Sequence, residues 1–221
     1  MRAKTLGIAL LGLAVVLVAA PAEAKRKKGK KNQNVTKVIP KKAFIEAIEK
    51  LAEEERVPVA SSTLVEKGRG EDYYGVGKLL DGDEETFWAE GAKGGGWHEW
   101  IALHLPDDTT HVEITPGAGK EQFENFNRPK RLWLDVYLVK LKRDKRTDEK
   151  KITFEWLGRT KYRFGDKPQP VRKKVPAKLP ELAMTMRTFY VGVVILRHIY
   201  KGQFNDTSIA EIKPSAVWGE L

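Results

Sequence analysis

The chain has 221 residues, which suits one domain with appendages, and it contains no cysteine. Disulfides, a cysteine nucleophile and an acylated cysteine are therefore excluded, and the fold must depend on its apolar core or on a bound metal. The formal net charge is +10, and part of this charge is concentrated near the N-terminus.

Residues 1–24 have the features of a secretory signal peptide. Arg2 and Lys4 form a positive start, residues 5–20 are an uncharged and mostly apolar run, and Ala-Glu-Ala ending at Ala24 fits the small-x-small cleavage pattern. A membrane-spanning helix needs about 20 apolar residues, so cleavage is favoured over an uncleaved anchor. We expect export, to a secreted, periplasmic or cell-surface location.

Residues 25–39 form a basic leader, which begins with "KRKKGKKNQNVTK". It has no apolar periodicity, so we predict that it is disordered. It either attracts an anionic polymer or membrane surface, or it is a solvated leader that keeps the cleavage site accessible. The second interpretation is favoured.

An amphipathic α-helix is predicted within residues 40–56, at about Lys41 to Glu55. Pro40 suits a first helical position and Pro58 follows the end. Apolar residues recur at helical spacing, namely Phe44, Ile45, Ile48, Leu51 and Ala52. We expect this face to pack on the following domain, in preference to binding a partner.

From residue 57 to residue 221 the apolar period changes to two, and no further helical layer is indicated. Gly, Pro, Asp and Asn separate short alternating segments, a pattern typical of an all-β sandwich or barrel. The predicted strands include residues 100–105, 111–115, 131–140, 151–158, 189–200 and the segment "SIAEIKP". Residues 143–151 resemble a charged hairpin, and residues 164–180 are predicted to be a long loop or an irregular edge.

Catalytic patterns are weak. No pair of histidines has helical metal-binding spacing, and neither a nucleophile elbow nor a phosphate-binding loop is present. Glu90 with Glu99, or Asp83 with Glu85, could be imagined as a glycosidase pair, but such a pair needs a fixed separation across a cleft. We therefore expect no enzyme activity.

Four stretches together resemble the discoidin-like (coagulation factor five/eight type C) domain. They are "GVGKLLDGDEETFWAEG", "GGGWHEWIALHL", "NFNRPKRLWLDVY" and "HIYKGQFNDTSIAEIKP". More narrowly, residues 60–214 are similar to the glycan-binding, translocation-associated domain of secreted NAD glycohydrolases. The resemblance implies a galactose-binding-like jelly-roll β-sandwich that recognises carbohydrate without catalysis. NAD hydrolysis belongs to a separate domain in those proteins.

The resemblance also implies a structural calcium ion at the Asp-Gly turn. Its ligands would be the side chains of Asp81, Thr86 and Glu211 and the carbonyl groups of Lys78, Asp83 and Ala210. Calcium prefers six to eight hard oxygens, which a tight turn can direct to one point. An EF-hand is excluded because Thr86 stands where its loop requires glycine. The alternative is an ordinary turn without an ion.

Sugar recognition needs an aromatic platform with nearby polar groups, placed on loops at one end of a sandwich. The candidates are Tyr73, Tyr74, Trp97, His98, Asn125, Asn127 and Arg128. Trp88 and Trp100 are expected in the core instead.

The leading hypothesis is thus an exported, non-catalytic module for glycan or another cell-envelope ligand, with no specific nucleic-acid partner. The first alternative is a structural or protein-interaction module of the envelope that uses the same sandwich. In that case the helix or the basic leader would make the contact. A hydrolase with an unrecognised site is the third hypothesis.

Overall fold

The computed structural model describes residues 39–53, 57–143, 150–179 and 188–216. The predicted signal peptide and nearly all of the basic leader lie outside these residues and stay predictions. The described residues contain the helix α2 (Lys41–Glu53) and the short 3-10 helix η1 (Val76–Leu80). Their strands are β1 (Val59–Ala60), β2 (Trp88–Ala89), β3 (Trp100–Leu105), β4 (His111–Pro116), β5 (Arg128–Arg143), β6 (Lys150–Arg163), β7 (Val171–Lys174), β8 (Thr188–Tyr200) and β9 (Ser208–Ser215).

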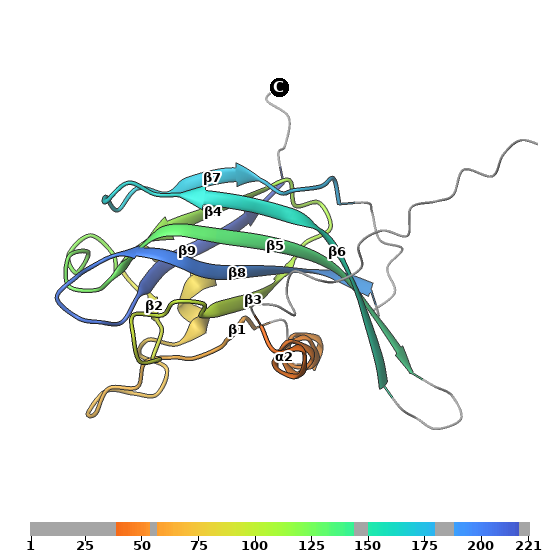
Figure 1. Cartoon of the computed structure of the whole chain (residues 1–221), viewed down its shortest axis with the longest axis horizontal. Helices are drawn as coiled ribbons and strands as arrows, with labels where there is room; N and C mark the ends of the chain where they lie inside the picture. The colour runs from red at the N-terminus through yellow and green to blue at the C-terminus, as the bar shows by residue number, and fades with distance from the viewer. Residues whose placement is uncertain (1–38, 54–56, 144–149, 180–187, 217–221) are drawn as a thin grey trace, which may run out of the picture.

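The described strands form two sheets that pack face to face, with α2 outside them (Figure 1). The first sheet has five strands in the order β1-β3-β8-β5-β6, and the second has four in the order β2-β9-β4-β7. Neighbouring strands are antiparallel throughout these two sheets. The predicted all-β sandwich preceded by one amphipathic helix is therefore confirmed.

The main core lies between the sheets and follows the period-two pattern. Leu132, Leu134 and Val136 of β5 are fully buried there, as their alternation predicts. Trp88 and Trp100 are 0% and 7% exposed, which confirms that they belong to the interior.

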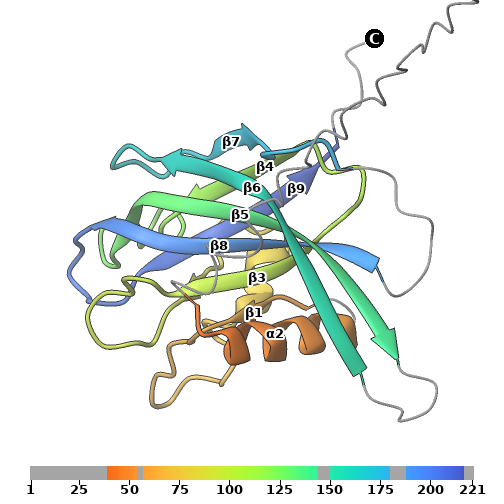
Figure 2. The same cartoon turned by 45° about the vertical axis from the view of Figure 1, so that its right-hand side comes forward.

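A second core lies between α2 and the outer face of the five-stranded sheet (Figure 2). Phe44 of α2 is fully buried, and its ring centroid lies 5.2 Å from that of Tyr137 and 5.0 Å from that of Phe154. Because α2 covers this part of the sheet, Tyr137 is buried although it faces away from the main core. The helix is therefore part of the domain. Ile39, which the sequence places in the leader, is also buried here.

The structure covers nearly all of one further predicted segment and only the ends of another. Residues 164–180, predicted as a loop or irregular edge, contain the edge strand β7, which pairs with β4. The middle of the predicted hairpin at residues 143–151 lies outside the described residues, although β5 and β6 pair up to Arg143 and Lys150. Across the described part of the chain, no helix is both long and apolar enough to cross a membrane.

Candidate functional site

The predicted metal turn directly follows η1. Gly82 has a φ of 80°, which the sequence Asp-Gly permits without strain. Asp81 Oδ1 accepts a hydrogen bond from the Asp83 backbone N–H at 3.0 Å, and the Thr86 hydroxyl donates to Asp81 Oδ2 at 2.7 Å. Thr86 Oγ1 also lies 3.1 Å from the Asp83 carbonyl oxygen. These three predicted ligands therefore converge on one turn.

Glu211 reaches the same turn from β9. Its Oε2 accepts a hydrogen bond of 3.0 Å from the Gly82 N–H, so the carboxylate ties the last strand to a turn 129 residues earlier. The side chain is 2% exposed. Burial raises the pKa of Glu211 to about 6, and the ammonium of Lys213 partly opposes this rise. Ala210, the adjacent predicted carbonyl ligand, is fully buried on β9.

The chemistry of these donors suits calcium, because carboxylate, hydroxyl and carbonyl oxygens are its preferred ligands. Lys78 adds a competing cation, since its ammonium lies 3.7 Å from Asp81 Oδ2. Among the described residues, no group of three or more His, Cys, Asp or Glu side chains is placed to hold a metal. An ion at this turn would therefore depend on the carbonyl groups and the Thr86 hydroxyl as well as on the two carboxylates.

The predicted sugar-binding residues gather around loops at one end of the sandwich. An isolated bridge joins Asn127 to Thr207, and thereby ties the loop before β5 to the loop between β8 and β9. Asn127 is buried, with its side-chain amide donating to the Asn205 carbonyl and its Oδ1 accepting from the Gly202 N–H at 2.9 Å. Its side chain thus fixes loop backbone. Asn125 is half-buried, and its carbonyl accepts from the Phe204 N–H at 2.7 Å.

Arg128 fixes the same end of the molecule. It is 6% exposed and binds the Asp166 carboxylate in a two-pronged contact, with Nε to Oδ1 at 2.8 Å and Nη2 to Oδ2 at 2.9 Å. Its Nη1 donates to the carbonyls of Phe126 and Lys201, each at 3.2 Å. The guanidinium therefore holds three segments together.

A cluster of aromatic rings underlies these loops. Tyr74, Phe87 and Phe126 are buried and pack with ring centroids 5.0–5.8 Å apart. Tyr73 and Phe204 extend the cluster outward and are 43% and 50% exposed. Of the two predicted tyrosines, Tyr73 is therefore partly exposed, with the Arg69 guanidinium 4.1 Å from the centre of its ring, whereas Tyr74 packs beneath it.

Trp97 lies on a neighbouring loop and is 65% exposed. The glycines before it take left-handed conformations, and His98 has a φ of 77°, which is uncommon for a residue with a side chain. The Trp97 and His98 rings contact each other with centroids 4.6 Å apart. Burial, followed by the charge of Arg197, lowers the pKa of His98. The loop thus holds Trp97 outward while its base packs on the domain.

Glu90 holds this loop from beneath. It is fully buried, and its carboxylate accepts hydrogen bonds from the N–H groups of Ala92 at 2.7 Å and Thr207 at 3.1 Å. Burial raises its pKa to about 7, although these two bonds oppose the rise. The carboxylate of Glu99 accepts from the hydroxyls of Ser61 and Ser62 instead. Each carboxylate of this imagined glycosidase pair is therefore engaged with protein groups.

Neither Phe204 nor the anchoring role of Glu90 was predicted from the sequence. Phe204 has a recognisable signal, since it is one apolar side chain inside the polar stretch "KGQFNDT". The role of Glu90 has no such signal, because its burial depends on how the loop folds over it.

Comparison with known proteins identifies the family of this domain. Residues 53–214 match the family model described as the NAD glycohydrolase translocation F5/8 type C domain. No curated protein matches the chain in sequence.

Several solved structures are similar. An F5/8 type C domain from Bacteroides fragilis shares 14% identity, with a TM-score of 0.44, and the match covers 72% of this chain and 89% of that one. CpGH89CBM32-4, produced by Clostridium perfringens and in complex with glcNAc-alpha-1,4-galactose, shares 12% identity, with a TM-score of 0.34 and coverage of 74% and 91%.

The arabinofuranosyltransferase AftD from Mycobacteria shares 16% identity, with a TM-score of 0.41, and the match covers 71% of this chain. The chain spans only 10% of the length of that transferase. Since the family model covers most of the chain, the protein belongs to the NAD glycohydrolase translocation F5/8 type C domain family and has its discoidin-like β-sandwich fold.

Proposed function

We propose that this protein is an exported, non-catalytic module that binds a glycan or another cell-envelope ligand at the loop end of its sandwich. The observation that carries the proposal is the outward display of three aromatic side chains, Tyr73, Trp97 and Phe204, on neighbouring loops. A group of exposed apolar side chains is a feature of ligand-binding surfaces, and a flat aromatic ring can lie against the apolar face of a pyranose.

The loops that carry these rings are anchored before any ligand arrives. Glu90 and Asn127 hold backbone groups, and Arg128 clamps the neighbouring segments. A pre-organised surface loses little conformational entropy on binding, which favours recognition of a ligand. The anchors also explain why these residues are polar and yet buried.

The alternative in which α2 contacts a partner is less well supported. The apolar face of the helix already packs on the five-stranded sheet, so only its polar face is exposed. Nearly all of the basic leader, which could make such a contact, lies outside the described residues.

A glycan array with the exported form of the chain tests the proposal. We expect binding that is lost in Trp97→Ala and weakened in Phe204→Ala. Val57→Ala, which removes a 45% exposed apolar side chain before β1, is the matched control and should bind as the parent does. Failure to bind any sugar, with or without calcium, or equal binding by all three variants, would contradict the proposal.

A structural calcium ion at the Asp81 turn is part of the same proposal. The convergence of Asp81 and Thr86 and the arrival of Glu211 at Gly82 support it. Binding would displace the Lys78 ammonium, which can move into solvent because its side chain is 37% exposed. The ion would join the two ends of a domain that has no disulfide.

The melting temperature tests this ion. We expect it to be higher in calcium than in chelator, because a ligand that binds only the folded state stabilises that state. Asp81→Ala should lose the difference. Asp83→Ala should keep it, since Asp83 would contribute only its carbonyl group. Equal melting of the parent protein in calcium and in chelator would rule out the ion.

A further inference from the structure

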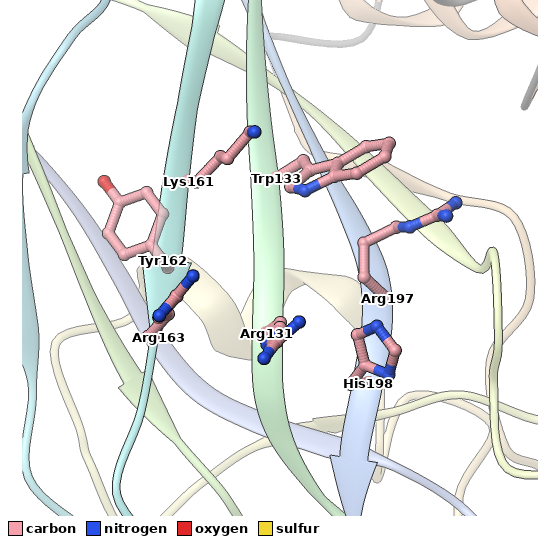
Figure 3. Close-up of a pocket in the computed structure, with 7 residues that line it drawn as sticks. All are labelled: Arg131, Trp133, Lys161, Tyr162, Arg163, Arg197 and His198. Atoms are coloured by element: carbon pink, nitrogen blue, oxygen red, sulfur yellow. The ribbon is translucent and has the colours of Figure 1, made fainter.

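The outer face of the five-stranded sheet is covered by α2 over only part of its area. Beyond the helix, β5, β6 and β8 line a cavity of about 170 Å³ (Figure 3). It is lined by two aromatic residues and five basic or imidazole side chains, namely Trp133, Tyr162, Arg131, Lys161, Arg163, Arg197 and His198. This cavity shares no lining residue with the Asp81 turn or with the exposed aromatic rings, although it borders the loop of Trp97 and His98, because the His98 N–H donates to the Leu196 carbonyl.

None of the described residues that line the cavity is acidic. Within the described residues, Arg131, Lys161 and Arg163 have no ion pair with a carboxylate. The nearby Asp135 is fully buried and is already bound by Arg159, with Nε to Oδ1 at 2.7 Å and Nη2 to Oδ2 at 2.6 Å. Four basic side chains, three from arginine and one from lysine, therefore share one small space.

Arg197 is in an electrostatically unfavourable position. Its guanidinium lies 4.0 Å from the centre of the Trp133 ring, and that of Arg159 lies 3.9 Å from the same centre. Its Nε is buried and has no hydrogen-bond acceptor among the described residues. Burial and the charge of Arg159 lower the pKa of Arg197. A buried donor without an acceptor costs free energy, and a bound anion would supply one.

A β-bulge places these groups together. Arg131 pairs with His198, and the next residue of β5, Leu132, pairs with Leu196, so Arg197 is the extra residue. Bulges redirect side chains, and this one sets Arg197 and His198 side by side next to Arg131. The cluster of positive charge is thus fixed by strand geometry and is not a chance feature of mobile loops.

We propose that this cavity is a second binding site, for the phosphate group of a phosphorylated saccharide or of a lipid headgroup. Arginine binds phosphate through paired hydrogen bonds. Several arginines on neighbouring strands suit a doubly charged phosphate better than they suit a singly charged carboxylate. Typical pockets for drug-sized ligands have about 300–1,000 Å³, so this smaller space suits one compact group. The inference does not depend on glycan binding at the loops.

The test follows the arginine Nε–Hε signals in ¹⁵N NMR spectra during titration with inorganic phosphate. We expect the Arg197 signal to shift, and chloride at matched ionic strength to leave it in place. Arg131→Gln, at an exposed position, should weaken binding about tenfold, as expected when a charge-assisted contact is lost. Arg172→Gln, which removes the same charge from the other sheet, is the control.

Two further comparisons show whether the phosphate belongs to a saccharide or to a lipid headgroup. Glucose 1-phosphate is compared with glucose, and vesicles of phosphatidylglycerol with vesicles of phosphatidylcholine. Dependence on Arg131 in either arm supports the site and assigns its source. The proposal is overturned if phosphate leaves the Arg197 signal unchanged, if chloride shifts it equally, or if Arg131→Gln and Arg172→Gln bind alike. Because phosphate carries no sugar ring, failure here is distinguishable from failure of glycan binding.

Discussion

Replacement of Glu90 by glutamine should remove part of the pH dependence of folding stability. Glu90 is fully buried beneath the loop that carries Trp97, and it accepts hydrogen bonds from two backbone N–H groups. Glutamine has nearly the same shape but does not ionise in the accessible pH range. The pair of proteins therefore isolates the ionisation of one buried carboxyl group.

The sign and size follow from the raised pKa. The ordinary pKa of 4.5 applies in the unfolded chain, and burial raises it to about 7 in the folded one. Between these values the folded protein holds a proton that the unfolded chain has released, so stability falls as pH rises. This contribution is fully present below pH 4.5 and lost above about pH 7. At about 1.4 kcal/mol per pKa unit, the shift corresponds to at most about 3–4 kcal/mol.

Urea unfolding followed by tryptophan fluorescence measures the effect. The free energy of unfolding of the parent minus that of Glu90→Gln should decrease from pH 4.5 to about pH 7 and then level off. Using this difference cancels the contribution of Glu211, which titrates in the same range. Glu121→Gln controls for loss of an exposed carboxylate. A difference that stays constant, or that grows with pH, would refute the reasoning.

Two further changes probe the helix and the loop. Phe44→Ala should lower the free energy of unfolding by about 3–5 kcal/mol, measured by urea unfolding, because it leaves a cavity between α2 and the sheet; a loss no larger than that of the exposed Lys42→Ala would show that the helix is dispensable. Gly96→Ala should lower the melting temperature more than Gly94→Ala does. Both glycines have positive φ, but only at Gly96 would the added Cβ lie within 2.8 Å of the Glu90 side chain; equal shifts would contradict the crowding.

Local pattern was sufficient to predict most of the fold. Alternation in β5 assigned Leu132 and Leu134 to one face and Trp133 to the other, because a strand turns successive side chains to opposite sides. Periodicity does not show how many layers cover a sheet. The burial of Tyr137 and Ile39 therefore emerges only when α2 is placed on the outer face.

The candidate sites were predictable only in part. Asp81 and Thr86 are near in sequence, and the family motif pointed to Glu211, which β9 brings to the same turn. The roles of Glu90 and Arg197 depend on loop packing and on a β-bulge, and neither feature has a reliable local pattern. Charge counting alone therefore did not locate the basic cavity.

The most direct test of the central claim is a ¹⁹F NMR titration of the protein labelled with 5-fluorotryptophan, using the best ligand from the glycan array. Trp88 and Trp100 are 0% and 7% exposed and serve as internal references, whereas Trp97 is 65% exposed. We predict that the Trp97 signal, assigned with Trp97→Phe, shifts with the ligand while the two reference signals remain in place. Binding that leaves the Trp97 signal unchanged, or that shifts the Trp133 signal instead, would contradict recognition at the loop end.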